Sequence, residues 1–337
     1  MTLRHAFFAL APTLVVALLV GTAAELYLRW ERAGARAAIE ARAAGRERCT
    51  QASADPVRIY EGIPGKCGNN ALGFRDRDHP LAKPAGTFRV AVIGDSIALG
   101  QGVHADEAFA WVLEAQLRHA GIEAEVMLFA VTGYSTMQEF PLLDMAWRYR
   151  PDLVVWAYAL NDPADPVFDN ANGELGVYFD RPTSYLGEYL RGLVHRVRFR
   201  IRTRDCPAEW HAKLHCGYRD EIDRQFGEIA AAARAQATPI VVAPLPVIPQ
   251  QGSFREYSLR AIHADLRELA RRHGLPVIDS LDAWEGVDVA AVQLTAPDGT
   301  HDPWHPNARG HALIGAYLAQ QLESTIGHAV PPDKRRP

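Results

Sequence analysis

The chain carries a histidine and a carboxylate at a spacing that suits acid–base catalysis. Asp302 precedes His305 by three residues. On an extended or turning loop, this spacing lets the carboxylate reach one imidazole nitrogen while the other nitrogen faces a nucleophile. Ser96 is the candidate nucleophile, because a glycine (Gly94) two residues before it can form a tight turn that leaves the hydroxyl unobstructed. The sequence Gly-Asp-Ser is also common in ordinary turns, so this segment alone does not decide between a nucleophile and a structural turn.

Two further residues could donate hydrogen bonds to a reacting oxygen. Gly133 follows an apolar run and could offer a bare backbone N–H. Asn161 follows the next apolar run and could offer its side-chain amide. Each of them is also a common turn or capping residue when considered alone.

The same C-terminal segment permits a metal site as a rival interpretation. Its potential ligands are His301, His305, His311, Asp298 and Asp302. Histidines four residues apart suit a metal when they lie on a helix, but Pro303 and Pro306 argue against a helix here. We therefore favour nucleophilic chemistry and expect no metal.

Short β-branched runs alternate with amphipathic stretches from Phe88 onward, which predicts an α/β domain with helices on both faces of a parallel sheet. The predicted strands are residues 88–93, 124–130, 152–159, 239–244 and 276–280. The predicted helices lie around Phe109–Leu117, from about Arg255 to His273, and from near Asn307 to near Leu322. In such sheets the functional site lies at the carboxyl ends of the strands, where the candidate residues fall.

The order of these features carries more information than any one of them. Ser96 follows the first strand, Gly133 the second and Asn161 the third, and an Asp-x-x-His motif precedes the last helix. This combination resembles the SGNH hydrolase family, also called GDSL-type esterases and lipases, over roughly residues 88–323. The resemblance implies a three-layer αβα fold around a flavodoxin-like, doubly wound parallel sheet of about five strands.

The resemblance also implies roles for the residues. Ser96 is the nucleophile, and His305 and Asp302 complete a catalytic triad. The oxyanion hole consists of the backbone N–H groups of Ser96 and Gly133 and the amide of Asn161. The implied reaction is two-step acyl transfer through an acyl-serine, which needs no metal and no cofactor. Ala159 stands where the family commonly has glycine in the Gly-x-Asn-Asp block.

For the substrate, the resemblance implies an O-acyl ester, in particular an O-acetyl ester, of a carbohydrate or glycolipid. An O-acyltransferase acting on an envelope polysaccharide with the same triad is the leading alternative. A catalytically idle carbohydrate-binding module is the second alternative. Nucleic acid is not an expected partner, because 36 Lys and Arg against 40 Asp and Glu give a net charge of -4.

The N-terminal run from Ala6 to Ala24 contains no charged residue. As a helix it would rise by roughly 28 Å, close to the hydrocarbon thickness of a bilayer. A cleaved signal peptide is the rival interpretation, since Thr22 and Ala24 fit the small-residue cleavage rule. We favour a membrane anchor, because the apolar run is longer than a usual signal segment and continues into a helix-prone sequence.

Two observations disagree about the side of the membrane on which the domain lies. Arginines that follow the span favour a cytoplasmic domain by the positive-inside rule: Arg29, Arg32, Arg36 and Arg42. The cysteines form two sequence-local pairs, Cys49 with Cys67 and Cys206 with Cys216, which favours disulfides in an oxidising compartment. Zinc is a weaker alternative for them, because neither pair has zinc-knuckle spacing. We expect a periplasmic, or at least extracytoplasmic, domain.

Composition changes along the chain predict its organisation. The expected parts are an anchor (1–28), a helical stalk (29–50), an irregular lead-in (51–87), a catalytic domain (88–325) and a tail (326–337). The lead-in segment 70–75 resembles that of bacterial envelope members of the family. An insert at 163–217 is rich in aromatic and basic residues, among them Tyr178, Phe179, Tyr185, Tyr189 and the stretch His195–Arg204. It either lines the substrate cleft or forms a surface excursion with its own small core.

Overall fold

A four-stranded parallel sheet forms the centre of the protein in a computed structural model, which describes residues 3–169, 173–249, 252–296 and 298–326. Residues 327–337 of the expected tail lie outside this range. The strand order is β4-β3-β5-β6, with bounds Ala124–Ala130, Phe88–Gly94, Leu153–Ala157 and Ile240–Val242. All residues of these strands are buried, as their continuous apolar sequences predict.

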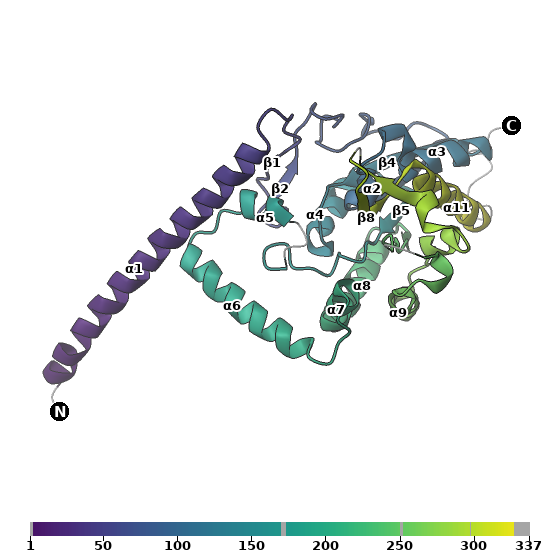
Figure 1. The fold of residues 1–337 in the computed structure, drawn as a ribbon. Helices are drawn as coiled ribbons and strands as arrows, with labels where there is room; N and C mark the ends of the chain where they lie inside the picture. Colours follow the sequence, from purple (N-terminus) through teal and green to yellow (C-terminus); the bar gives the residue numbers. More distant parts are fainter. Residues whose placement is uncertain (1–2, 170–172, 250–251, 297, 327–337) are drawn as a thin grey trace.

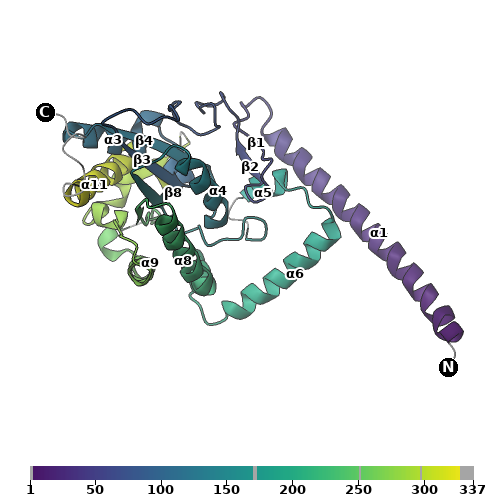
Figure 2. The ribbon, with the colours of Figure 1, turned by 180° about the vertical axis from the view of Figure 1, so that it is seen from behind.

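Helices cover both faces of the sheet, so the three-layer αβα architecture predicted from the sequence is confirmed (Figures 1 and 2). The chain adds strands on both sides of β3, and right-handed crossovers then place the connecting helices on opposite faces. One layer contains α3 (Phe109–His119) and α11 (Ala308–Ile326), which pack together. The other contains α4 (Thr136–Trp147), α8 (Arg219–Ala235) and α9 (Arg260–His273).

The remaining elements surround this core. The short helices are α2 (Ser96–Leu99), α5 (Gly173–Phe179), α7 (Trp210–Gly217) and α10 (Val289–Val292), and α6 (Tyr185–Arg202) is longer. Short 3₁₀ turns cover Ala105–Glu107, Phe254–Glu256 and Ser280–Trp284. Outside the main sheet, β1 (Thr50–Ala52) pairs antiparallel with β2 (Tyr60–Gly62), and β7 (Gln293–Thr295) pairs antiparallel with β8 (His301–Pro306).

The predicted fifth strand, residues 276–280, is not a full strand in the structure. Only Val277 forms a bridge, to Val242 of β6. The segment still runs beside β6, because Ile278 N donates to Val242 O across 3.0 Å and Val242 N donates to Pro276 O across 2.9 Å. Proline at 276 and at 244 removes two N–H donors, so the ladder on either side of this bridge is incomplete, although Ser280 N still donates to Pro244 O across 3.0 Å.

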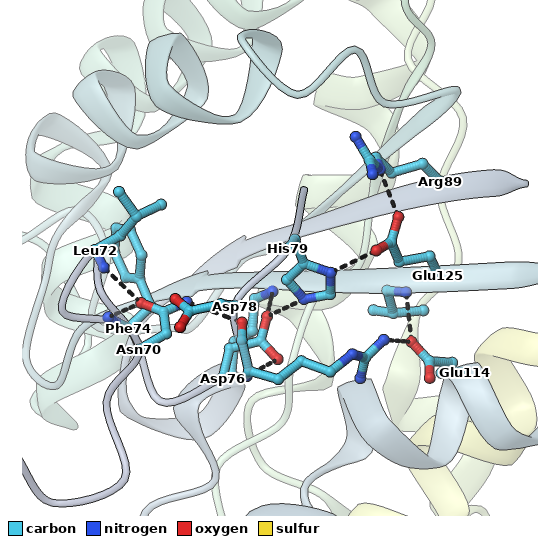
Figure 3. Close-up of polar contacts among 12 residues, drawn as sticks. Asn70, Leu72, Phe74, Asp76, Asp78, His79, Arg89, Glu114 and Glu125 are labelled. Atoms are coloured by element: carbon cyan, nitrogen blue, oxygen red, sulfur yellow. Dashed lines mark hydrogen bonds and ion pairs between the residues drawn. The ribbon is translucent and has the colours of Figure 1, made fainter. Parts of the chain in front are cut away.

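The outer edge of β4 is protected by carboxylates (Figure 3). An edge strand presents unpaired N–H groups that invite pairing with another chain. Here Val126 N donates to Glu114 across 2.7 Å, and Leu128 N donates to Asp76 across 2.8 Å. Glu114 comes from α3 and Asp76 from the lead-in, so two distant segments complete the edge of the sheet.

A buried charge cluster attaches the lead-in to the sheet. His79 lies between Asp76 and Glu125, at 3.0 and 2.7 Å, and Arg89 of β3 donates to Glu125 across 2.7 Å (Figure 3). Burial disfavours the charged imidazole, but the two carboxylates outweigh it and raise the pKa of His79. Further along, Arg75 donates to the carbonyls of Gly100 and Val103. The lead-in therefore also supports the loop that follows α2.

Helix α1 (Leu3–Arg42) contains the whole apolar run and most of the expected stalk without a break. The stretch Pro12–Ala43, which lies in α1 except for its last residue, is the one stretch among the described residues that is long and apolar enough to cross a membrane. Beyond α1, the structure joins Cys49 to Cys67 and Cys206 to Cys216, with Cα–Cα distances of 5.5 and 5.9 Å.

Candidate active site

Ser96 begins α2 directly after β3, at the carboxyl edge of the sheet. The turn is tight: a methyl group on Gly94 would lie 2.6 Å from Cβ of Ala98, so only glycine fits there. Asp95 caps α2 by accepting a hydrogen bond from Ile97 N across 2.9 Å. Ser96 itself stays partly exposed, so its hydroxyl is accessible to a substrate.

His305 and Asp302 lie together on β8 and face this serine. His305 Nε2 is 2.9 Å from Ser96 Oγ, and His305 Nδ1 is 2.8 Å from Asp302 Oδ2. Asp302 also accepts hydrogen bonds from the backbone N–H groups of Trp304 and His305 at its other oxygen. These bonds fix the carboxylate, so the Nδ1 nitrogen carries the proton and Nε2 is free to accept one from the serine.

The electrostatics of Asp302 favour a permanent negative charge. Partial burial opposes ionisation of this carboxyl group, but its hydrogen bonds with His305 and Trp304 outweigh burial and lower its pKa. A carboxylate that stays ionised can stabilise the imidazolium ion that forms when His305 accepts a proton.

The other residues of the rival metal interpretation make different contacts. His311 is fully buried, stacks on Phe109 with ring centroids 6.1 Å apart, and burial lowers its pKa to about 3. His301 lies 3.1 Å from Thr295 on the neighbouring strand, and Asp298 caps its own turn at Thr300. Nowhere in the described residues do three His, Cys, Asp or Glu side chains gather so as to hold a metal ion.

Gly133 and Asn161 follow the strands on either side of β3, as their sequence positions predict. Gly133 has φ 71°, a left-handed conformation that favours glycine, and is partly exposed. Asn161 is almost buried, and its amide donates to Asp95 Oδ2 across 3.2 Å. The parallel register aligns Gly94 with Ala130 and with Ala157, which brings the three strand ends to one edge of the sheet.

A group of buried carboxyls behind these strand ends was not predicted from the sequence. Burial raises the pKa values of Asp95 and Asp162, and it raises that of Glu139 to about 8. Glu139 accepts from the indole of Trp156 across 2.7 Å, and Asp162 accepts from Ala159 N across 2.9 Å. Because these three carboxyl groups are buried, the protonated, neutral form is favoured for at least one of them.

A cavity of about 670 Å³ is lined in part by Pro303 and Trp304, the two residues between Asp302 and His305 in the sequence. Its other walls come from the insert and from the loop after β6: Asp169, Glu209, Trp210, His211, Val247, Ile248, Pro249, Tyr257, Ser258 and Leu259. Trp210 and Trp304 meet edge to face at 5.4 Å, so aromatic rings from two segments border the cavity.

The insert therefore contributes to the cavity, but not through the aromatic residues singled out from the sequence. Tyr178 and Phe179 pack against each other and against the stalk and lead-in, through Arg48 and Tyr60. Tyr185 lies under arginines of α1, and Tyr189 is exposed on α6. The lining residues Glu209–His211 lie inside the loop that the Cys206–Cys216 disulfide closes, a few residues after the basic stretch. The Trp-His pair in this cysteine loop was the available signal.

A known protein family matches most of the chain. The sequence model of the GDSL-like lipase/acylhydrolase family matches residues 92–313. The chain belongs to this family. As a GDSL-like acylhydrolase it is an ester hydrolase, and the family match spans all the candidate residues from Ser96 to His305. No curated protein matches the chain significantly.

Solved structures with low sequence identity to this acylhydrolase are also found. TesA is 18% identical, with 70% of this chain and 98% of TesA covered and a TM-score of 0.42. The esterase EstA from Pseudoalteromonas sp. is 13% identical, with 71% and 99% covered and a TM-score of 0.43. The acetyl xylan esterase AlAXEase is 14% identical, with 71% and 99% covered and a TM-score of 0.42.

Proposed function

We propose that the protein is a serine esterase whose triad is Ser96, His305 and Asp302. The observation that carries this proposal is the continuous chain of contacts from Ser96 Oγ to His305 Nε2 at 2.9 Å and from His305 Nδ1 to Asp302 at 2.8 Å. An accessible hydroxyl, a base within hydrogen-bond reach and a carboxylate that orients the base are what nucleophilic acyl transfer requires.

The reaction proceeds in two steps. Ser96 Oγ attacks the ester carbonyl as its proton passes to His305 Nε2, and the imidazolium then protonates the leaving alcohol. A water molecule, activated by the same histidine, attacks the acyl-serine and releases the acid. The tetrahedral oxyanion in each step receives hydrogen bonds from Ser96 N, Gly133 N and the Asn161 amide, each worth roughly 3 to 4 kcal/mol for a well-placed donor.

The substrate we propose is an O-acyl ester, in particular an O-acetyl ester, of a carbohydrate or glycolipid. The cavity beside the triad supports this class because it combines aromatic walls with polar groups. Trp210 and Trp304 offer flat apolar surfaces to a sugar ring, while Asp169, Glu209 and His211 offer hydrogen-bonding atoms to its hydroxyl groups. Buried Nε2 of His211 has no hydrogen-bond partner among the described residues.

We further propose that residues 1–28 anchor the protein in a membrane, with residues 29–50 as a stalk and residues 88–325 as an extracytoplasmic catalytic domain. The uncharged run and the two disulfides support this topology. Arginines after the span have a structural use that does not depend on topology, since Arg32 pairs with Glu188. A reporter that is active only in the cytoplasm, fused after Pro337, is expected to be silent, and an active reporter would reverse the topology.

The esterase proposal is tested by incubating the purified full chain with a fluorophosphonate probe and with a short-chain chromogenic ester. We expect labelling of Ser96 and turnover of the ester. Labelling without turnover would favour the acyltransferase alternative or a highly selective hydrolase. Absence of labelling would favour a binding module and would overturn the assignment of Ser96.

A further inference from the structure

Helix α6 exposes an apolar stripe along its outward side. The stripe consists of Tyr189, Leu190, Leu193, Val194, Val197 and Ile201, all of them exposed. They recur at intervals of three or four positions, as adjacent pairs at 189–190 and 193–194 and then singly, which places them on one side of a helix. Isolated exposed apolar residues are normal, but a continuous row on one helix marks an interaction surface.

The opposite side of α6 already packs against the domain. Glu188 and Gly192 are buried on it, and His195 Nε2 lies 2.8 Å from Asp169. Phe199 packs against Tyr218 with ring centroids 5.6 Å apart. The side of α6 that packs on the domain is therefore already occupied, and the apolar stripe is a separate surface.

Arginines flank the stripe on both sides. Arg191, Arg198 and Arg202 lie on one flank, and Arg196 and Arg200 lie on the other. Within the part of the chain that the structure describes, no carboxylate pairs with the first three, which line a groove of about 470 Å³ together with Leu190 and Val194. A row of apolar side chains with unpaired cations at its borders is complementary to an anionic lipid surface.

The position of α6 along α1 supports the same occupant. Glu25, which directly follows the uncharged run, accepts hydrogen bonds from the first backbone N–H groups of α6, at Tyr185 (3.1 Å) and Leu186 (2.8 Å). Tyr27 and Trp30 are exposed on α1 at this level, as aromatic residues are at a membrane–water interface. Helix α6 thus starts where the span would leave the bilayer.

The apolar stripe also lies on the side of α6 that faces the N-terminal span of α1. Leu186, on the stripe side of α6, approaches the span, because a methyl group on Gly21 would lie 4.0 Å from Leu186 Cδ2. Glu188, on the opposite side, pairs with Arg32 beyond the span. In both views α6 runs away from α1 along the border of the domain, on the side of the N-terminal half of α1 (Figures 1 and 2).

We propose that α6 is an interfacial membrane helix, with its apolar stripe in the boundary between headgroups and acyl chains and its arginines on the phosphates of anionic lipids. This inference rests on the proposed N-terminal anchor. It assigns the insert a second membrane contact that holds the catalytic domain against the bilayer surface.

The test uses the full chain in vesicles of phosphatidylcholine with added phosphatidylglycerol. The photoreactive residue p-benzoylphenylalanine replaces Val197 of α6, Leu18 of α1 or Arg271 of α9 in three separate samples. After irradiation, we expect lipid adducts by mass spectrometry at Val197 and Leu18. Arg271, exposed on the domain, is the matched control and should give none.

The outcomes separate the two proposals. A lipid adduct at Leu18 without one at Val197, or a protein–protein cross-link at Val197, would overturn the interfacial helix and leave the anchor intact. Adducts at neither position would overturn both. The triple variant Arg191→Gln, Arg198→Gln and Arg202→Gln should lower the adduct yield at Val197 at least about fivefold with anionic vesicles and much less with phosphatidylcholine alone. If the triple variant lowered the adduct yield at Val197 by the same factor on both kinds of vesicle, the role of the arginines would be contradicted.

Discussion

Asn161 donates its side-chain amide to Asp95, the residue directly before the candidate nucleophile, across 3.2 Å. Ser96 Oγ lies 3.3 Å from the same carboxylate oxygen. One buried carboxyl group therefore positions both the hydroxyl that would attack the ester and an amide that would bind the oxyanion. This contact uses one N–H of the amide, so the second would be available to the oxyanion in the proposed mechanism.

Replacing Asn161 with alanine should lower kcat by roughly a hundredfold or more, because the amide acts mainly in the transition state. KM should change little, since the ground-state carbonyl needs this donor less than the oxyanion does. Steady-state kinetics with a short-chain ester measure both constants. Thermal unfolding is the control, and a large loss of stability instead of turnover would contradict the role.

Ser96→Ala and His305→Ala should each abolish ester cleavage, and the double variant should be no worse than either single variant, because the two side chains act as a unit. His301→Ala is the matched control: it removes a nearby histidine that contacts Thr295. Its activity should stay near that of the unchanged chain. Ester cleavage that survives Ser96→Ala and is lost to a chelator would point to metal chemistry.

Asp302→Asn should lower kcat by up to about ten thousandfold, because a neutral partner favours the wrong imidazole tautomer. Asp298→Asn is the control on the same segment, where the carboxylate only caps its own turn at Thr300. Burst and steady-state kinetics should assign the Asp302→Asn loss to acylation and deacylation alike. Comparable losses in the two variants would contradict the assignment of Asp302.

His79→Gln should destabilise the fold more at acidic than at alkaline pH. The carboxylates around His79 raise its pKa in the folded state, so its contribution is complete below the unfolded value of about 6.5 and is lost as pH rises through the higher folded value. Urea unfolding at pH 6 and at pH 9 measures this difference. His119→Gln, which removes an exposed histidine, is the control variant for the substitution itself.

Removing a disulfide should lower the free energy of unfolding by about 3 kcal/mol, because each closes a loop of between ten and eighteen residues. The double variant Cys206→Ser with Cys216→Ser tests the insert, and Cys49→Ser with Cys67→Ser tests the lead-in. Mass mapping of unreduced peptides gives the connectivity directly. Free thiols or a pairing between the two loops would contradict both assignments.

The sequence predicts the buried centre of this fold well. Apart from Arg89 and Glu125, β3 and β4 are apolar on both faces, and such runs between helices have few other solutions than a parallel sheet. The contact between His305 and Asp302 could also be predicted from the sequence, because the two residues are only three positions apart in the chain. The incomplete pairing of segment 276–280 could not be predicted, since it depends on the N–H groups that Pro276 and the neighbouring Pro244 lack.

Contacts between segments that are distant in the chain could not be predicted from the sequence. The contact of Asn161 with Asp95 depends on the relative positions of two strand ends. The capping of Leu128 by Asp76 likewise depends on how the lead-in wraps the sheet. Tyr185 was expected near the cleft or in a local core, and it lies instead beneath Arg29 of α1, which no local pattern indicates.

Helix α1 continues from the span to Arg42 without a break and contacts the domain through Arg32 and Glu40, which pair with Glu188 and Tyr178. With the span in a bilayer, the helical rise puts Arg42 roughly 26 Å above Glu25, and the domain cannot swing as it would on a flexible tether. The height of the catalytic cleft above the lipid is then fixed. An enzyme anchored in this way would select acyl groups by their distance from the membrane as well as by their chemistry, and it would process a polymer only along the section that passes at that height.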